Sequence, residues 1–145
     1  MENKELKNQE LLEILKEYFE KRDDVLMAFL FGSYAKATTH KESDVDIAVY
    51  LKPTSGSLEW EEFDAKYDGE DAIWLDIERL VRRNVDMVVL NRARSSIASS
   101  ALHGRTIVIK DRGLYLDFML RVTAEAEDYR EMVEDYWKIK QATHT

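Results

Sequence analysis

Apolar residues change their spacing several times along the chain, and each change marks a predicted element. At 4–22, apolar side chains recur every three or four positions, which is the spacing of one helix face. Short apolar segments predict four strands, at 25–31, 44–51, 85–90 and 105–110. Helical spacing also predicts helices at 71–83, 95–102 and 114–141, with shorter helices at 33–38 and from Leu58. The pattern is typical of the α/β (α+β) class: a small mixed β-sheet backed by helices, with a long C-terminal helix.

The length and composition fit one globular domain. The 145 residues are 45% hydrophobic and 34% charged, so we expect a single domain over 1–145 with its core at about 25–110. The chain has no cysteine, which is compatible with a reducing cytoplasm and excludes disulfides and thiolate metal sites. The N-terminus is polar, and no apolar run approaches the ~20 residues of a membrane span. We therefore expect a cytoplasmic protein with no membrane partner.

Two carboxylates lie at the start of the second predicted strand. Asp44 and Asp46 are two positions apart, so their side chains point to the same face, while Val45, Ile47 and Val49 point to the other. Two carboxylates that converge at neutral pH repel each other and need a cation between them. Their hard oxygen ligands favour Mg²⁺, which proteins usually share with substrate phosphates. Asp44 and Asp46 are therefore candidate metal ligands.

A glycine turn follows the first predicted strand. Gly32 permits a close approach of the backbone, and the amide and hydroxyl of Ser33 can bind a phosphate. Lys36 lies one turn into the short helix expected there and is within reach of a triphosphate. Together with the carboxylates, this turn predicts nucleotidyl transfer from a nucleoside triphosphate.

These motifs resemble a known signature. The pattern resembles the signature of the polymerase-beta-type nucleotidyltransferase superfamily. It consists of Gly32-Ser33, ten further residues and then Asp44-x-Asp46. More narrowly, the pattern resembles the minimal nucleotidyltransferase (MNT) proteins, which occur as antitoxins beside HEPN-domain ribonuclease toxins. The strand around Asp86 matches the family's third carboxylate strand, and the segment 101–107 resembles its helix-to-strand turn.

The resemblance implies a fold, a reaction and a set of roles. The fold would be that of the nucleotidyltransferases, and the reaction a transfer of AMP from ATP to a hydroxyl, that of a tyrosine, on a HEPN toxin. Asp44 and Asp46 would bridge two Mg²⁺ ions, and Asp86 would hold the ion beside the acceptor and orient or deprotonate its hydroxyl. Gly32, Ser33 and Lys36 would bind the nucleotide. The chain would thus be an adenylyltransferase antitoxin.

Two other functions stay open at this stage. One is transfer of a nucleotide to a small molecule such as an aminoglycoside, although such enzymes usually carry a second domain for the acceptor. The other is a binding module that masks the toxin by contact while its own site is silent. The residues alone indicate triphosphate chemistry and do not choose the acceptor.

Charge bears on the choice of partner. The formal net charge of −8 opposes direct binding of nucleic acid, whose phosphates require a basic surface. Six arginines lie in the middle of the chain: Arg79, Arg82, Arg83, Arg92, Arg94 and Arg105. Some of them could face the triphosphate or a partner; alternatively, they are solvated at helix ends and in loops. We therefore expect a protein partner and a nucleotide rather than a nucleic acid.

The predicted C-terminal helix is rich in aromatic residues. Its first half is expected to cover the sheet. The side chains that could do so are Tyr115, Phe118, Met119, Tyr129, Met132, Tyr136 and Trp137. Near its end, Tyr136, Trp137 and Ile139 exceed what one small core needs. They either extend the core or form a docking surface for a partner.

Overall fold

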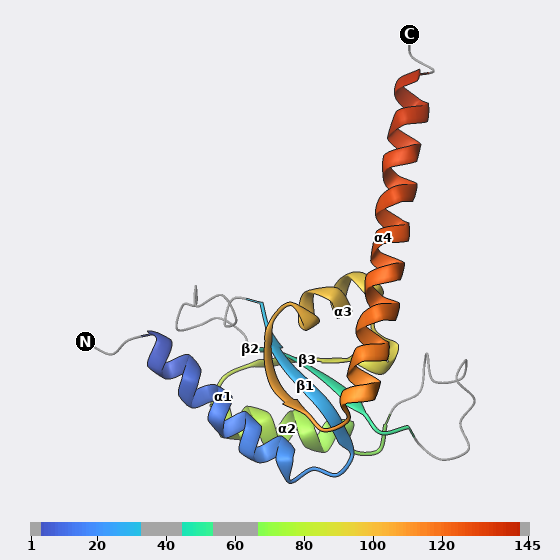
Figure 1. Cartoon of the computed structure of the whole chain (residues 1–145). Helices are drawn as coiled ribbons and strands as arrows, with labels where there is room; N and C mark the ends of the chain where they lie inside the picture. Colours follow the sequence, from blue (N-terminus) through green and yellow to red (C-terminus); the bar gives the residue numbers. More distant parts are fainter. Residues whose placement is uncertain (1–3, 33–44, 54–66, 143–145) are drawn as a thin grey trace.

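The computed structural model describes residues 4–32, 45–53 and 67–142 (Figure 1). The helices and strands within these ranges are α1 (Lys4–Glu20), β1 (Val25–Phe31), β2 (Val45–Leu51), α2 (Glu70–Val81), β3 (Val85–Val89), the 3₁₀ helix η2 (Leu90–Arg92), α3 (Ser95–Leu102), β4 (Arg105–Ile109) and α4 (Arg112–Ala142). The helices predicted at 33–38 and from Leu58 lie outside the described residues. Among the described residues, no helix combines the length and the apolar character that crossing a membrane requires.

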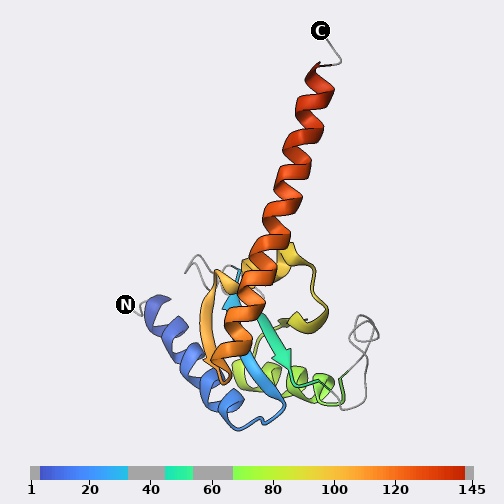
Figure 2. The ribbon, with the colours of Figure 1, turned by 45° about the vertical axis from the view of Figure 1, so that its right-hand side comes forward.

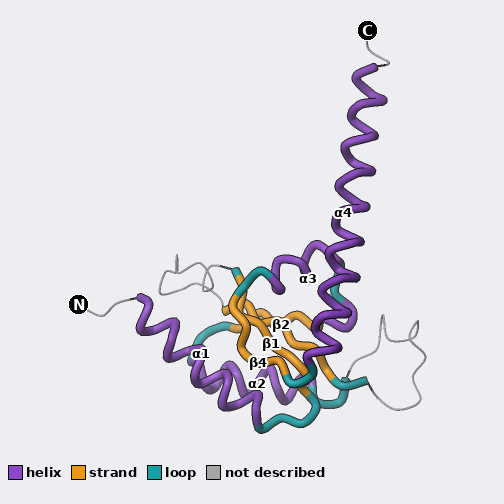
Figure 3. The backbone as a smooth tube through the Cα atoms, viewed as in Figure 1, coloured by secondary structure: helices purple, strands orange, loops and turns teal. Residues whose placement is uncertain are grey.

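The four described strands form one mixed sheet in the order β3-β2-β1-β4 (Figure 3). β1 lies in the centre and is antiparallel to both β2 and β4, whereas β2 and β3 are parallel. The run Val25–Phe31 is apolar at every position because β1 is covered on both faces. The prediction of a small mixed sheet backed by helices is confirmed.

Helices cover both faces of the sheet. One buried cluster joins α1 and α2 to the sheet through Leu15, Phe19, Ile73 and Ile77. The second cluster, on the opposite face, joins α3 and the first turns of α4 through side chains that include Phe118. Figures 1 and 2 show the two helix layers, with α4 running on far beyond the sheet. Near the starts of β2 and β3, Asp46 is partly exposed and Asp86 is exposed.

α2 ends at a left-handed residue that the sequence does not predict. Its C-terminal residue Arg82 has φ of 55° and ψ of 38°, the left-handed conformation that usually belongs to glycine. The Arg82 amide donates to the Glu78 carbonyl at 2.9 Å. The helix therefore stops at Val81 and the chain turns sharply into β3, two residues before the predicted end at 83.

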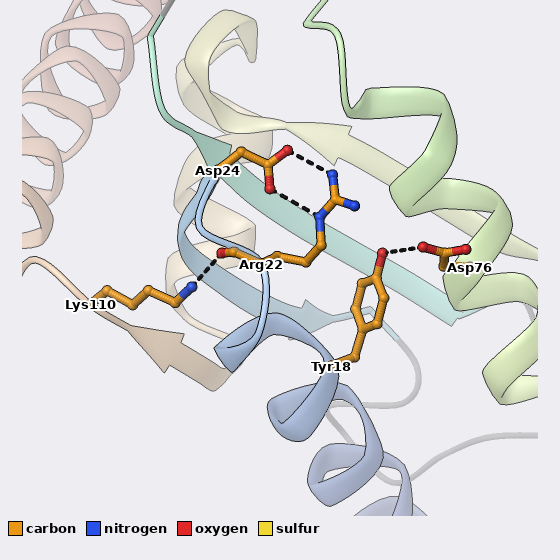
Figure 4. A network of polar contacts seen from close by, with 5 residues as sticks. All are labelled: Tyr18, Arg22, Asp24, Asp76 and Lys110. Carbon is orange, nitrogen blue, oxygen red and sulfur yellow. Dashed lines mark hydrogen bonds and ion pairs between the residues drawn. The ribbon is translucent and has the colours of Figure 1, made fainter.

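A polar network joins α1 to α2 and to β1 (Figure 4). The Tyr18 hydroxyl donates to a carboxylate oxygen of Asp76 at 2.7 Å, and Arg22 binds both carboxylate oxygens of Asp24, at 3.0 and 2.7 Å. Burial, together with the hydrogen bond to Asp76, raises the pKa of the Tyr18 hydroxyl. The network fixes how the two helices cross on their face of the sheet.

We expect Tyr18→Phe to lower the free energy of unfolding by about 1.5–3 kcal/mol, the range for a hydrogen bond to a charged group. Since the folded chain holds Tyr18 neutral, this stabilisation is present below pH ~10, where an unfolded tyrosine is also neutral, and is lost as the pH rises from there towards the raised folded pKa. Urea unfolding at pH 7 and at pH 11 measures both effects. Tyr136→Phe, at an exposed tyrosine of α4, is the matched control. Equal losses at the two pH values would contradict the account.

Candidate active site

Three strand ends lie side by side at one end of the sheet. Gly32 directly follows β1, Asp46 is the second residue of β2, and Asp86 is the second residue of β3. In the sheet register Asp46 is opposite Phe31 on one side and opposite Asp86 on the other. Partner residues on adjacent strands point to the same face, about 4.8 Å apart along the sheet. The structure thus brings together Asp46 and Asp86, which the sequence separates by forty positions.

The carboxylates lie on the same face as α3 and α4. Val45, Ile47 and Val49 point into the cluster beneath α1 and α2. Because side chains alternate along a strand, Asp46 points to the opposite face, as predicted. Asp44, Ser33 and Lys36 lie outside the described residues, so their predicted roles stay predictions.

Gly32 is fitted against the Asp46 carboxylate. Its φ is +73°, in the left-handed region that L side chains rarely adopt. A Cβ atom at this position would lie 2.2 Å from Asp46 Oδ2, far inside contact distance. Only glycine therefore leaves the backbone next to this oxygen without displacing it. The glycine turn predicted from the sequence is confirmed, and its glycine lies directly beside the carboxylate.

Side chains of α2 hold the start of β3 in place. The Trp74 indole N–H donates to the Val85 carbonyl at 2.8 Å, and a Glu78 carboxylate oxygen accepts the Val85 amide at 3.2 Å. Both backbone groups of the residue before Asp86 are thus fixed. The helical spacing identified Trp74 as a residue of the α2 stripe, but gave no sign that it anchors β3.

A hollow of about 570 Å³ opens beside Gly32. It is lined by Gly32 and by the end of α3 with its following turn, including Ser99, Ser100, His103 and Arg105. The turn lies this close because Gly104 has no side chain: a Cβ there would lie 2.3 Å from the Leu30 carbonyl oxygen. Its φ is not in the left-handed region, so Gly104 serves close approach rather than a left-handed helix end. The hollow therefore places an arginine and three serine or histidine side chains near the carboxylates.

The six arginines of the middle of the chain separate in the structure. Arg105 lines the hollow beside Gly32, and Arg94 lines a second hollow between α3 and α4. Arg92 pairs with Glu70 at the start of α2, and this pairing raises the pKa of the guanidinium. Arg105 is thus the member of the group that lies beside Gly32, and no local sequence signal distinguishes it from the others.

The carboxylate pair fits a divalent cation. Within the described residues, no three His, Cys, Asp or Glu side chains come together as a metal site. Asp46 and Asp86 nevertheless supply, on one face of the sheet, the oxygen ligands that Mg²⁺ prefers. Asp44, two positions before Asp46, would complete the set.

A mixed sheet that carries carboxylates at two adjacent strand starts, next to a glycine turn, is compatible with the nucleotidyl transfer expected from the sequence. The sequence model of the family described as polymerase beta, nucleotidyltransferase matches residues 13–113. The chain belongs to this family and is a nucleotidyltransferase. A search of curated proteins gives no significant match.

Solved structures with the same fold come from toxin–antitoxin complexes. A chain of a toxin–antitoxin complex with AMP-PNP is 18% identical, with a TM-score of 0.60, over 86% of this chain and 96% of that one. A chain from a complex of tri-AMPylated Shewanella oneidensis HEPN toxin with MNT antitoxin is 14% identical, with a TM-score of 0.57, over 92% of this chain and 98% of that one. A chain of a MntA–HepT complex is 15% identical, with a TM-score of 0.53, over 97% and 99%. The chain therefore has the minimal nucleotidyltransferase fold of MNT antitoxins, as the sequence resemblance implied.

Proposed function

We propose that this chain transfers AMP from ATP to a hydroxyl group, that of a tyrosine, on a HEPN-domain ribonuclease and so inactivates it. The observation that carries the proposal is the pairing of Asp46 with Asp86 on one face, beside Gly32, in a nucleotidyltransferase of this family. The partner and the nucleotide are supported by the similar folds, which come from complexes of an MNT antitoxin with a tri-AMPylated HEPN toxin and from a complex with AMP-PNP.

In the proposed reaction the acceptor oxygen attacks the α-phosphorus of ATP in line. A new oxygen–phosphorus bond forms, the bond from the α-phosphorus to the bridging oxygen breaks, and pyrophosphate leaves. Asp86 is exposed at the edge strand, where its carboxylate can accept the hydroxyl proton. Mg²⁺, when held by Asp44, Asp46 and Asp86, supplies positive charge against the negative charge that develops on the phosphates. The side chains of this protein thus position the acceptor hydroxyl and accept its proton.

The proposed nucleotide site extends from the glycine turn. Gly32 presents backbone beside Asp46, and Ser33 and Lys36 follow it directly in the sequence. Arg105, His103 and the serines of the α3 end add donors for phosphate oxygens in the hollow beside Gly32. ATP would therefore lie between the β1–β2 edge and the end of α3.

A ribonuclease assay tests the proposal. The cognate HEPN-domain protein is incubated with this chain, ATP and Mg²⁺, separated from it, and then assayed for cleavage of RNA. We expect the separated protein to stay inactive, because a covalent adduct survives removal of the antitoxin. A ribonuclease that recovers full activity after separation would instead support masking by contact. Pyrophosphate release that depends on an aminoglycoside, without any effect on the toxin, would support the small-molecule alternative.

A further inference from the structure

The second half of α4 exposes large apolar side chains. The first turns of the helix bury Phe118 and Val122 against the sheet. Figures 1 and 2 both show the C-terminal part of α4 projecting away from the sheet. Its large apolar side chains are exposed there, with Met132 70%, Tyr136 57%, Trp137 53% and Ile139 66% accessible to solvent. Exposed apolar side chains of this size favour a binding surface over a solvated helix end.

The exposed apolar side chains continue the face that packs on the sheet. The apolar positions of this face are spaced by close to whole helical turns. The gaps are four, eleven and three positions, along the series Phe118, Val122, Val133 and Tyr136. The same stripe therefore runs from the core into solvent. Lys140 lies over the rings of Tyr136 and Trp137, at 5.7 and 5.4 Å from their centroids, and the two rings meet edge to face at 5.6 Å. These contacts order the stripe in the free chain and reduce the entropy lost on binding.

Charge identifies the kind of partner. Residues 124–142 carry six acidic side chains and three basic ones, a net charge of −3 within a chain of −8. Two copies of such a helix repel each other, whereas a basic surface is attracted. A ribonuclease has a basic surface because it must bind the phosphates of RNA. The stripe therefore suits a basic protein with an apolar groove better than a second copy of this chain.

A hollow of about 790 Å³ lies beside the exposed apolar side chains of α4. It lies between α3 and α4, and its lining includes Val133 of the exposed stripe, Ala126 and Ser99. Ser99 also lines the hollow beside Gly32, which adjoins Asp46. The two hollows thus share one lining residue of α3, which places them on neighbouring parts of the surface between the projecting helix and Gly32.

We propose that residues 124–142 of α4 form a docking helix for a basic protein acceptor, and that the α3–α4 hollow guides the acceptor segment of that protein to Asp46 and Asp86. This inference rests on the proposed function and adds to it the route by which the acceptor arrives. The docking helix provides binding affinity through Met132, Tyr136 and Trp137, and the hollow orients the acceptor segment towards the carboxylates.

The docking helix is tested with the double variant Tyr136→Ala, Trp137→Ala and the cognate HEPN-domain protein. We expect the dissociation constant to rise about 100-fold, since buried Tyr and Trp dominate protein interfaces. Leu120→Ala is the matched control, because Leu120 is 68% exposed and lies two positions from Phe118, on the other side of α4. Alanine preserves the helix, so both variants should keep the wild-type melting temperature.

The route is tested with Ala126→Trp, which fills the α3–α4 hollow without reaching the one beside Gly32. We expect AMP transfer to the partner to fall about tenfold through misplacement of the acceptor, with ATP affinity unchanged. If the wild type binds the partner but transfers no AMP, the proposed function fails, and the dissociation constants still test the docking helix. An unchanged dissociation constant for the double variant would overturn the inference. The inference would also be overturned if the wild-type chain alone sediments as a dimer and the double variant sediments as a monomer.

Discussion

Asp46→Asn will reduce AMP transfer about 10³-fold, the effect of removing one preorganised charge-stabilising group. Asparagine keeps the size of the side chain and its place opposite Asp86, so the sheet register should survive. It removes the negative charge that a divalent cation requires, and the two carboxylates of the described site become one. Initial rates of AMP incorporation at saturating ATP and Mg²⁺ measure the effect, and isothermal titration with Mg²⁺ measures the loss of metal affinity.

Two comparisons make the result specific to the site. Asp117→Asn removes a carboxylate from an exposed position of α4 and should leave the transfer rate within twofold of wild type. Asp86→Asn should also lose transfer, since it removes the proposed proton acceptor along with the second carboxylate. Both site variants should still bind the HEPN-domain protein with wild-type affinity. Transfer at the wild-type rate by Asp46→Asn would contradict the assignment of the site.

Gly32→Ala will reduce transfer about 100-fold, as expected when a misplacement of about 1 Å disturbs a catalytic group. The added methyl group would lie 2.2 Å from Asp46 Oδ2, so either the turn or the carboxylate must move. The left-handed backbone adds a cost of about 1–2 kcal/mol to the free energy of unfolding for a residue with a Cβ atom. Transfer kinetics and urea unfolding of the same preparation report the two effects separately.

Gly113→Ala is the matched control for this substitution. Gly113 lies in the first turn of α4, and a Cβ there would be 3.5 Å from Asp111 Oδ1, an ordinary contact. Alanine favours a helix over glycine by about 0.5–1 kcal/mol, so this variant should be slightly stabilised and fully active. If Gly32→Ala transfers AMP at the wild-type rate, the close approach of the Gly32 backbone to the Asp46 carboxylate is not required for transfer.

The sequence was sufficient for most elements because their patterns are local. β1 and α3 have the predicted bounds, since an unbroken apolar run and a helix closed before Gly104 leave little choice. The end of α2 differs because Arg82 takes a left-handed conformation that its residue type does not favour. Asn91 was also missed: its amide accepts from the Leu51 amide and donates to the Leu51 carbonyl, both at 2.8 Å, and so extends the pairing of β2. Such contacts depend on the packing of distant elements.

The candidate site was predictable in its residue types and less so in its surroundings. The spacing of Gly32 and Asp46 and the resemblance around Asp86 pointed to residues that the structure brings together, and their chemical roles stay predictions. The parallel register that sets Asp46 opposite Asp86 involves strands almost forty residues apart, which no local pattern encodes. Ser99 and Arg105 reach the site only because Gly104 lets the α3–β4 turn approach β1. The sequence also predicted α4 as one helix, but not the point at which the sheet beneath it ends.

Intact-mass spectrometry of the cognate HEPN-domain protein tests the central claim most directly. The protein is incubated with this chain, ATP and Mg²⁺, and in parallel with the Asp46→Asn variant. We predict a gain in mass by one or more AMP units with the wild type and none with the variant. A toxin that binds the wild-type chain and loses its ribonuclease activity, yet keeps its original mass, would contradict the account.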